Sequence, residues 1–191
     1  MELAVIFSHH DLSVRERELI YTLLSKTFFV VEEQLSFDDI EKLYLDLIPV
    51  PDYSTTLIDL IFPIKFDDNF FQIFNFNRWH SFKNIVKEIK YRRGKLPVVL
   101  LIQFKNLADK TDLDVIFSVK NELYRPFEMA IEKMEYLVDV VPTHLEILPP
   151  NTFELFYLYN DVSSKWVPYR AKSNTNNYIN DHFFKDGKWN K

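Results

Sequence analysis

Apolar residues recur along this chain with two different periods, which predict the segments that form helices and those that form strands. Spacings of three and four residues indicate amphipathic helices, whereas short runs of β-branched and aromatic residues indicate strands. The predicted helices cover residues 13–26, 36–48, 81–92 and 126–138. The predicted strands cover residues 2–7, 56–66, 70–76, 97–104, 112–120, 153–159 and 165–170. Residues 27–31 fit either a continuation of the first helix or a separate strand.

Turn and cap residues add detail to this order. The sequence Asp-Asp-Asn at 67–69 predicts a turn that joins the strands on either side of it into a hairpin. Ser81 is expected to cap the third helix, and Gly94 to end it in the left-handed conformation that glycine adopts without strain. The segment 97–104 is almost entirely apolar, which predicts a strand buried on both faces of a sheet that has helices on both sides.

The alternation of strands and helices over residues 1–105 predicts an α/β or α+β sandwich with a mixed central sheet flanked by helices. We expect this part to be the core, with a helical insertion at 32–53. Residues 106–170 are predicted to form a β-rich C-terminal extension of the same domain. Residues 171–191 are polar and rich in asparagine, which predicts a tail held by a few aromatic residues.

Composition narrows the possible functions. The 191-residue chain has two glycines, Gly94 and Gly187, which cannot build the glycine-rich loops of P-loop, dinucleotide-binding or nucleophile-elbow proteins. It has no cysteine, which excludes thiol catalysis and zinc–thiolate or iron–sulfur centres and fits an intracellular, cytoplasmic protein. No apolar run of roughly 18 residues occurs, so we expect no membrane contact through a spanning helix. The formal net charge of −5 gives no overall attraction to nucleic acid.

Three segments carry a family resemblance. The first match is residues 16–20 followed by 28–31, which resemble the first helix and first strand of one fold. The second is residues 57–61 with Asp59, which resemble its aspartate-bearing strand. The third is residues 90–104, which resemble its second helix and fourth strand. That fold belongs to the PD-(D/E)xK nuclease superfamily, in particular the archaeal Holliday-junction resolvases. The resemblance implies carboxylates that hold Mg²⁺ and a lysine close to the attacking water. It assigns Glu16 and Asp59 to the catalytic site.

The resemblance does not extend to the strand that carries the family's catalytic carboxylate and lysine. The family has a carboxylate and a lysine two residues apart on one strand, so that both point to the same face. Aligning 70–77 with that strand puts Phe74 and Phe76 at the two positions, and neither neighbouring register supplies an acid with a cation. We therefore expect a nuclease-fold protein that is catalytically inactive, needs no cofactor, and acts by nucleic-acid binding or within a DNA-processing assembly. Residues 32–53 are an insertion relative to a minimal resolvase.

A basic cluster offers a local site for phosphate on this otherwise acidic chain. Three of its members share one side of the helix at 81–92, and the others surround the end of that helix. The candidate nucleic-acid-binding residues are Lys83, Lys87, Lys90, Arg92, Arg93 and Lys95. The alternative is a solvated helix face whose cations complement the helix dipole.

Other interpretations stay open. Glu16 also suits the third position of a capping box begun by Ser13, and Asp59 also suits a buried structural carboxylate that has a partner. Residues 9–11, His-His-Asp, could ligate a metal or form a polar loop before the first helix. Two further functions are an assembly subunit whose aromatic residues form an interface in a homo-oligomer or with a protein partner, and an active Mg²⁺-dependent endonuclease.

Overall fold

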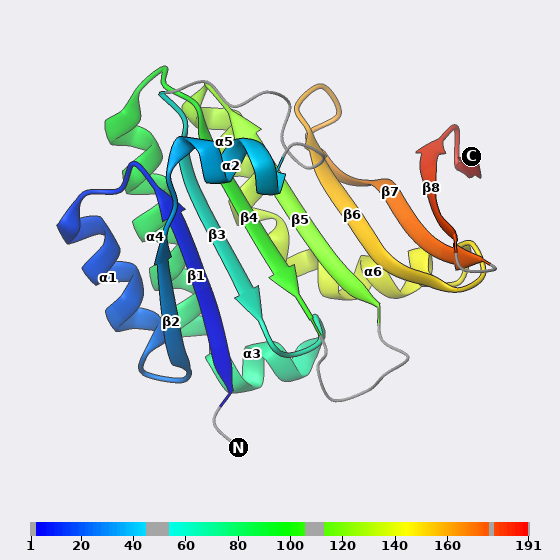
Figure 1. Cartoon of the computed structure of the whole chain (residues 1–191), viewed down its shortest axis with the longest axis horizontal. Helices are drawn as coiled ribbons and strands as arrows, with labels where there is room; N and C mark the ends of the chain where they lie inside the picture. Colours follow the sequence, from blue (N-terminus) through cyan, green and yellow to red (C-terminus); the bar gives the residue numbers. More distant parts are fainter. Residues whose placement is uncertain (1–2, 45–53, 106–112, 176–177, 191) are drawn as a thin grey trace.

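The computed structural model describes residues 3–44, 54–105, 113–175 and 178–190. Within these residues the chain forms one nine-stranded mixed sheet in the order β2-β1-β3-β4-β5-β6-β7-β8-β9, with helices on both faces (Figure 1). The predicted α/β architecture with a mixed central sheet and strands in the C-terminal part is therefore confirmed. The sheet is continuous from β4 into β5, across the expected boundary near residue 105.

Three parallel strand pairs, each joined by helices, make up most of the sheet. Each pair runs antiparallel to the next, because β1 pairs with β3 and β4 with β5 in opposite directions. The three units are β1 (Ala4–His10), α1 (Val14–Leu24) and β2 (Phe29–Gln34); β3 (Thr56–Phe62), α3 (Asp68–Phe74), α4 (Phe76–Arg93) and β4 (Val98–Phe104); and β5 (Asp114–Asn121), α5 (Tyr124–Glu132), η1 (Met134–Tyr136), α6 (Leu137–Leu145) and β6 (Thr152–Asn160). The antiparallel strands β7 (Lys165–Thr175), β8 (Tyr178–Lys185) and β9 (Lys188–Asn190) complete it.

The two faces of the sheet are covered very unequally. The helices α1, α3, α4, α5 and α6 lie behind the sheet in Figure 1, and the larger apolar core fills the space beneath them. On the other face α2 (Phe37–Tyr44) lies in front of the sheet and covers a smaller apolar cluster that includes Ile40, Leu57 and Leu101. We call this second face the α2 face. It leaves room for a site beside α2.

The predicted strand at 70–76 is wrong, and with it the hairpin turn at 67–69. The segment is the helix α3, whose first turn is capped by the Asp67 side chain accepting a hydrogen bond from the Asn69 N–H at 2.9 Å. Phenylalanine favours strands, but Phe70, Phe71 and Phe74 stand at helical spacing and all three are buried against the core. Burial of this helical stripe outweighs the weak strand preference.

The next helix also begins earlier than predicted. Asn75 has a left-handed φ of +63°, which ends α3, and its side chain accepts from the Arg78 N–H to begin α4 at Phe76. Ser81 is therefore no cap, and its hydroxyl instead donates to the carbonyl of Asn77 inside the helix. Gly94 ends α4 with φ +57°, as predicted.

The C-terminal part extends the sheet. The predicted hairpin of 153–159 and 165–170 is confirmed as β6 and β7. Residues 171–175 continue β7, and most of the predicted polar tail forms β8 and β9. Phe183 packs on Tyr169 of β7 and Phe184 on His144 of α6, so these aromatic residues do hold the segment to the rest of the fold.

Candidate functional site

Asp59 lies at the centre of a polar site on the α2 face of the sheet. Alternate residues of a strand point to opposite faces, so Asp59 of β3 and Gln103 of β4 point toward α2 while their neighbours enter the main core. Helix α2 brings Tyr44 over them from the same face. Only 1% of Asp59 is exposed, which makes it the most buried carboxylic acid among the described residues.

Neutral donors surround the Asp59 carboxyl group. The Tyr44 hydroxyl donates to Oδ2 at 2.7 Å, and the Gln103 Nε2 lies 2.9 Å from both Oδ1 and Oδ2. Burial raises the pKa of Asp59 to about 6 from its ordinary value of 3.8, although these hydrogen bonds favour the ionised form and work against the rise. Burial and the Asp59 charge together raise the pKa of Tyr44, so this phenol stays a donor. The carboxyl group can therefore exchange a proton close to neutral pH.

A hollow of ≈ 410 Å³ opens beside Asp59 and carries charges of both signs. Ser8 donates to Glu33 at 3.2 Å on one side, and Lys172 pairs with Glu154 at 3.3 Å on the other. Its polar and charged lining residues are Ser8, Glu33, Tyr44, Asp59, Gln103, Lys105, Glu154 and Lys172. We call this hollow the Asp59 recess. Its mixed lining is suited to a polar ligand rather than to an apolar one.

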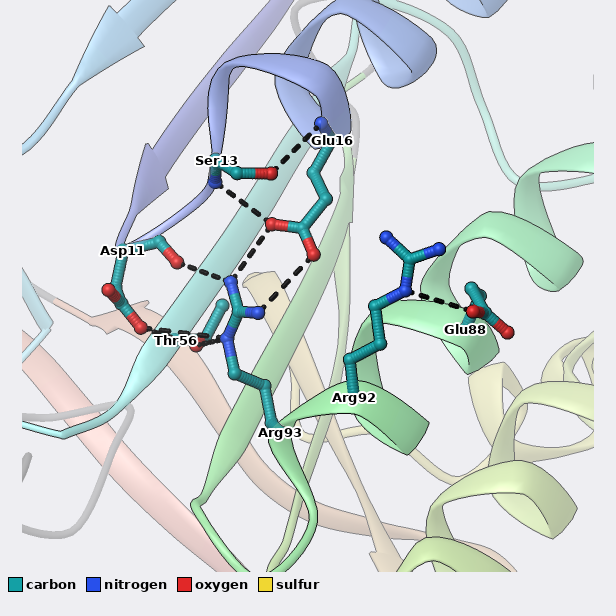
Figure 2. Close-up of polar contacts among 7 residues, drawn as sticks. All are labelled: Asp11, Ser13, Glu16, Thr56, Glu88, Arg92 and Arg93. Atoms are coloured by element: carbon teal, nitrogen blue, oxygen red, sulfur yellow. Dashed lines mark hydrogen bonds and ion pairs between the residues drawn. The ribbon is translucent and has the colours of Figure 1, made fainter.

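The other predicted catalytic residue, Glu16, ties two helices together. Its side chain accepts from the Ser13 N–H at 2.9 Å while the Ser13 hydroxyl accepts from the Glu16 N–H, which completes the capping box (Figure 2). Arg93 at the end of α4 donates to both carboxylate oxygens, at 2.9 and 3.3 Å. Burial tends to raise the pKa of Glu16, but the hydrogen bonds from Arg93 and Ser13 hold it below its ordinary value.

Arg93 is fully engaged at this junction. Figure 2 shows its guanidinium between Glu16, Thr56 and Asp11, to whose carbonyl it donates at 2.6 Å. This cluster lies where α1 and α4 meet on the helix-rich face, whereas Asp59 points to the α2 face. The structure thus does not bring Glu16 and Asp59 together, and each has its own set of partners.

Most residues of the predicted phosphate site are bound by groups of the protein itself. Lys83 donates to Glu132 and Glu135 at 2.8 and 2.7 Å, and Lys87 also bonds to Glu132. Lys90 is fully buried and donates to three backbone carbonyls, at 2.8 to 2.9 Å. These three lysines fasten α4 to α5 and to the turns around it.

The remaining two residues of the basic cluster lie at the surface. Arg92 pairs with Glu88 one turn earlier in α4 at 2.9 Å, as drawn in Figure 2, and both side chains are exposed. Lys95 is exposed in the turn before β4. Of the six candidates, these two are the most accessible to a phosphate group.

The segment 9–11 does not form a metal centre. The Nε2 of His9 lies 3.0 Å from Glu32, and Nδ1 of His10 lies 2.9 Å from the Leu35 carbonyl. The two histidines are neighbours in a strand, so their side chains point to opposite faces of the sheet. Burial lowers the pKa of His9. Across the ranges that the structure describes, no group of three or more histidine, aspartate or glutamate residues could hold a metal ion.

Tyr44, Gln103 and Lys105 are residues of the site that the sequence did not point to. A signal existed for two of them, because Gln103 is the only polar residue within the apolar strand β4 and Lys105 follows it at a spacing of two. For Tyr44 there was none, since a tyrosine on the apolar side of a helix fits the core equally well.

The chain matches no protein-family model, no curated protein and no solved structure. No helix among the described residues is long and apolar enough to cross a membrane. The geometry of the Asp59 recess is therefore the basis on which a function can be assigned.

Proposed function

We propose that this protein binds a small zwitterionic molecule, one that carries an ammonium or similar cationic group together with an acidic group, in the Asp59 recess. The observation that carries the proposal is the presence of Glu33 and Lys105, of opposite charge, around a buried carboxyl group in one hollow. Both act on Asp59 electrostatically: Glu33 raises its pKa, and Lys105 lowers it.

The two kinds of charge give the ligand its orientation. A cationic group would lie toward Asp59 and Glu33, and an acidic group would pair with Lys105, while Lys172 is already paired with Glu154. Hydrogen bonds to charged groups contribute about 1.5–3 kcal/mol each, so both ends matter for affinity. A ligand with only one charge would leave the opposite charge of the recess without a partner.

The hydrogen-bond donors around Asp59 favour the binding of a ligand over metal-dependent hydrolysis. The groups beside the Asp59 carboxylate are the hydrogen-bond donors of Tyr44 and Gln103, whereas a Mg²⁺ ion needs several oxygen ligands around it. An ammonium group needs only one remaining lone pair of the carboxylate. Glu33 and Glu154 line the same hollow, but within the described part of the chain they do not form with Asp59 a group of three side chains that could hold a metal ion.

A panel of amino acids of increasing chain length, matched with simple amines and simple carboxylic acids, tests this proposal by thermal shift and calorimetry. We expect at least one amino acid to bind and the singly charged compounds to fail. Asp59→Asn and Lys105→Gln should each weaken binding by roughly tenfold or more, since one charged contact is lost. Lys95→Gln, an exposed lysine outside the recess, is the matched control. If no zwitterion binds, or if binding survives both recess variants, the proposal is wrong.

A second candidate keeps the nuclease-like hypothesis. We propose it because Gln103 of the neighbouring strand β4 and Lys105 directly after it line the recess with Asp59, with the two-residue spacing of the family's carboxylate and lysine. An amide stands in place of the carboxylate, and a neutral amide offers Mg²⁺ no charge. Such a protein would bind DNA without cutting it.

The variant Gln103→Glu tests this second candidate because it places a second carboxylate next to Asp59. The wild-type chain should not nick plasmid or branched DNA with Mg²⁺ or Mn²⁺, but should retard DNA in gels at low salt, less so after Arg92→Ala with Lys95→Ala. Gln103→Glu should gain Mn²⁺ binding in calorimetry. The absence of both DNA binding and metal binding would exclude this candidate.

A further inference from the structure

The strand β2 forms one edge of the sheet and presents backbone groups to the outside. Within the described residues it pairs only with β1. The N–H groups of Phe29 and Leu35 donate inward, to Leu3 and His9 of the β1 side, so the odd-numbered residues of β2 face β1. The N–H and C=O groups of the even-numbered residues, Val30, Glu32 and Gln34, therefore point away from the sheet.

Exposed apolar side chains accompany this edge. Phe29 and Val31 are 58% and 37% exposed on the α2 face of β2, and Val14 and Tyr21 are 59% and 40% exposed on α1. A free edge with apolar residues normally pairs or is blocked by charges. Glu32 does not block this edge as a free charge, because Arg17 and His9 both lie within 3.1 Å of its carboxylate.

The outer side of α1 is complementary to itself. Val14, Arg17, Glu18 and Tyr21 stand at i, i+3, i+4 and i+7, which places them on one side of the helix, and together with Glu32 they line a shallow hollow of ≈ 270 Å³. If a second α1 lies antiparallel to the first, Val14 meets Tyr21 and Arg17 meets Glu18 of the second copy. Apolar residues thus meet apolar residues, and each charge meets its opposite.

We propose that two copies of this chain form a two-fold dimer through β2 and α1, with the sheets joined into one. The axis passes perpendicular to the sheet at Val31, so that Val31 faces Val31 of the second copy. Val30 and Glu32 then exchange backbone hydrogen bonds with Glu32 and Val30 of the second copy. An axis in this direction keeps both α1 helices on the same face and antiparallel.

The two halves of the interface are in register. The Arg17 Nη1 lies 3.1 Å from the Glu32 Oε1, so an ion pair connects the middle of the α1 stripe to the residue of β2 next to Val31. One axis can therefore serve both the strand pair and the helix pair. A different extended peptide could also pair with this edge, but only a second copy offers the reciprocal match along α1.

The chain has no cysteine, which allows a direct test with one introduced thiol. Facing residues whose N–H groups point away from each other in antiparallel strands have Cα atoms about 4.5 Å apart, within the range of a disulfide. Val31→Cys should therefore form a covalent dimer on mild oxidation. Val162→Cys, at a 99% exposed position in the turn after β6, is the matched control and should stay monomeric under the same conditions.

Sedimentation equilibrium completes the test. The wild-type chain should sediment at twice 23.0 kDa. Val31→Arg should sediment as a monomer, because it places two like charges on the axis, and its circular dichroism spectrum should show that it is folded. A wild-type monomer would overturn the proposal. A wild-type dimer whose Val31→Cys variant cross-links no faster than Val162→Cys would overturn it too, because the interface would lie elsewhere. Neither result depends on ligand or DNA binding at the Asp59 recess.

Discussion

The substitution Asp59→Asn measures how much the ionised, buried carboxyl group lowers the free energy of unfolding. Burial raises the pKa of Asp59 from its ordinary 3.8 to about 6. Each pKa unit corresponds to about 1.4 kcal/mol, so ionising this group in the folded protein costs about 3 kcal/mol more than in the unfolded chain. The folded pKa lies above the unfolded one. The stability linked to Asp59 is therefore fully present below pH 3.8 and is lost as the pH rises through 6.

Asparagine keeps the shape of the side chain and cannot ionise. Its oxygen can accept the hydrogen bond of Tyr44, and its amide can donate to the Gln103 oxygen once that side chain turns by half a rotation. We expect Asp59→Asn to be close to the wild type in stability at pH 4. At pH 8 it should be more stable than the wild type by about 1–3 kcal/mol, because the cost of ionisation is gone.

Urea unfolding at pH 4, 6 and 8, followed by tryptophan fluorescence and circular dichroism, gives both free energies of unfolding. The difference between wild type and variant should grow between pH 4 and 6 and then level off. Asp38→Asn, an exposed carboxylate of the helix that carries Tyr44, is the matched control and should change stability little at any pH. The reasoning is refuted if Asp59→Asn is less stable than the wild type at pH 8, or if the difference does not vary with pH.

Three further substitutions test contacts on the helix-rich face of the sheet. Lys90→Met should lower the free energy of unfolding in urea by about 3–5 kcal/mol, because three buried carbonyls lose their donor, whereas exposed Lys95→Met should change it by less than about 0.5 kcal/mol. Glu16→Gln should cost about 1–2 kcal/mol at pH 7. Because the pKa of Glu16 is lowered, this loss should fade as the pH falls, and a double-mutant cycle with Arg93→Met should show coupling. Phe74→Ala should cost about 3–5 kcal/mol in a thermal or urea melt, and a near-neutral result would place Phe74 outside the core.

Several elements could be predicted from the sequence because their signals are local. The capping box of Ser13 and Glu16 spans four residues, and Gly94 needs only its own backbone conformation. The strand at 98–104 follows from an apolar run that can reach full burial only inside a sheet. The alternation of such helical and strand segments over residues 1–105 was enough to predict the α/β class.

The segment 70–76 shows where local signals fail. Its phenylalanines suit both a strand and one side of a helix, so propensity could not decide between them. The choice depends on a core that accepts Phe70, Phe71 and Phe74 from one direction, and on Asn75 turning the chain into α4. The alignment of residues 70–77 with the family's catalytic strand is therefore wrong, because most of this segment lies in the helices α3 and α4.

The charged residues show the same limit over longer distances. A row of lysines in the sequence looks like a phosphate site, but Lys83 meets Glu132 and Glu135, 49 and 52 residues away. Arg93 meets Glu16 across 77 residues. A sequence pattern does not reveal partners at such separations, because only the packing of α4 against α1 and α5 creates them.

The sequence alone determined that Asp59 is a carboxylate inside an apolar strand and must find partners. Which partners it finds was decided only by the tertiary structure, which places β4 beside β3 and α2 above both. The physical reason is that a buried charge is tolerated where donors surround it, and Tyr44 and Gln103 come from parts of the chain 15 and 44 residues away.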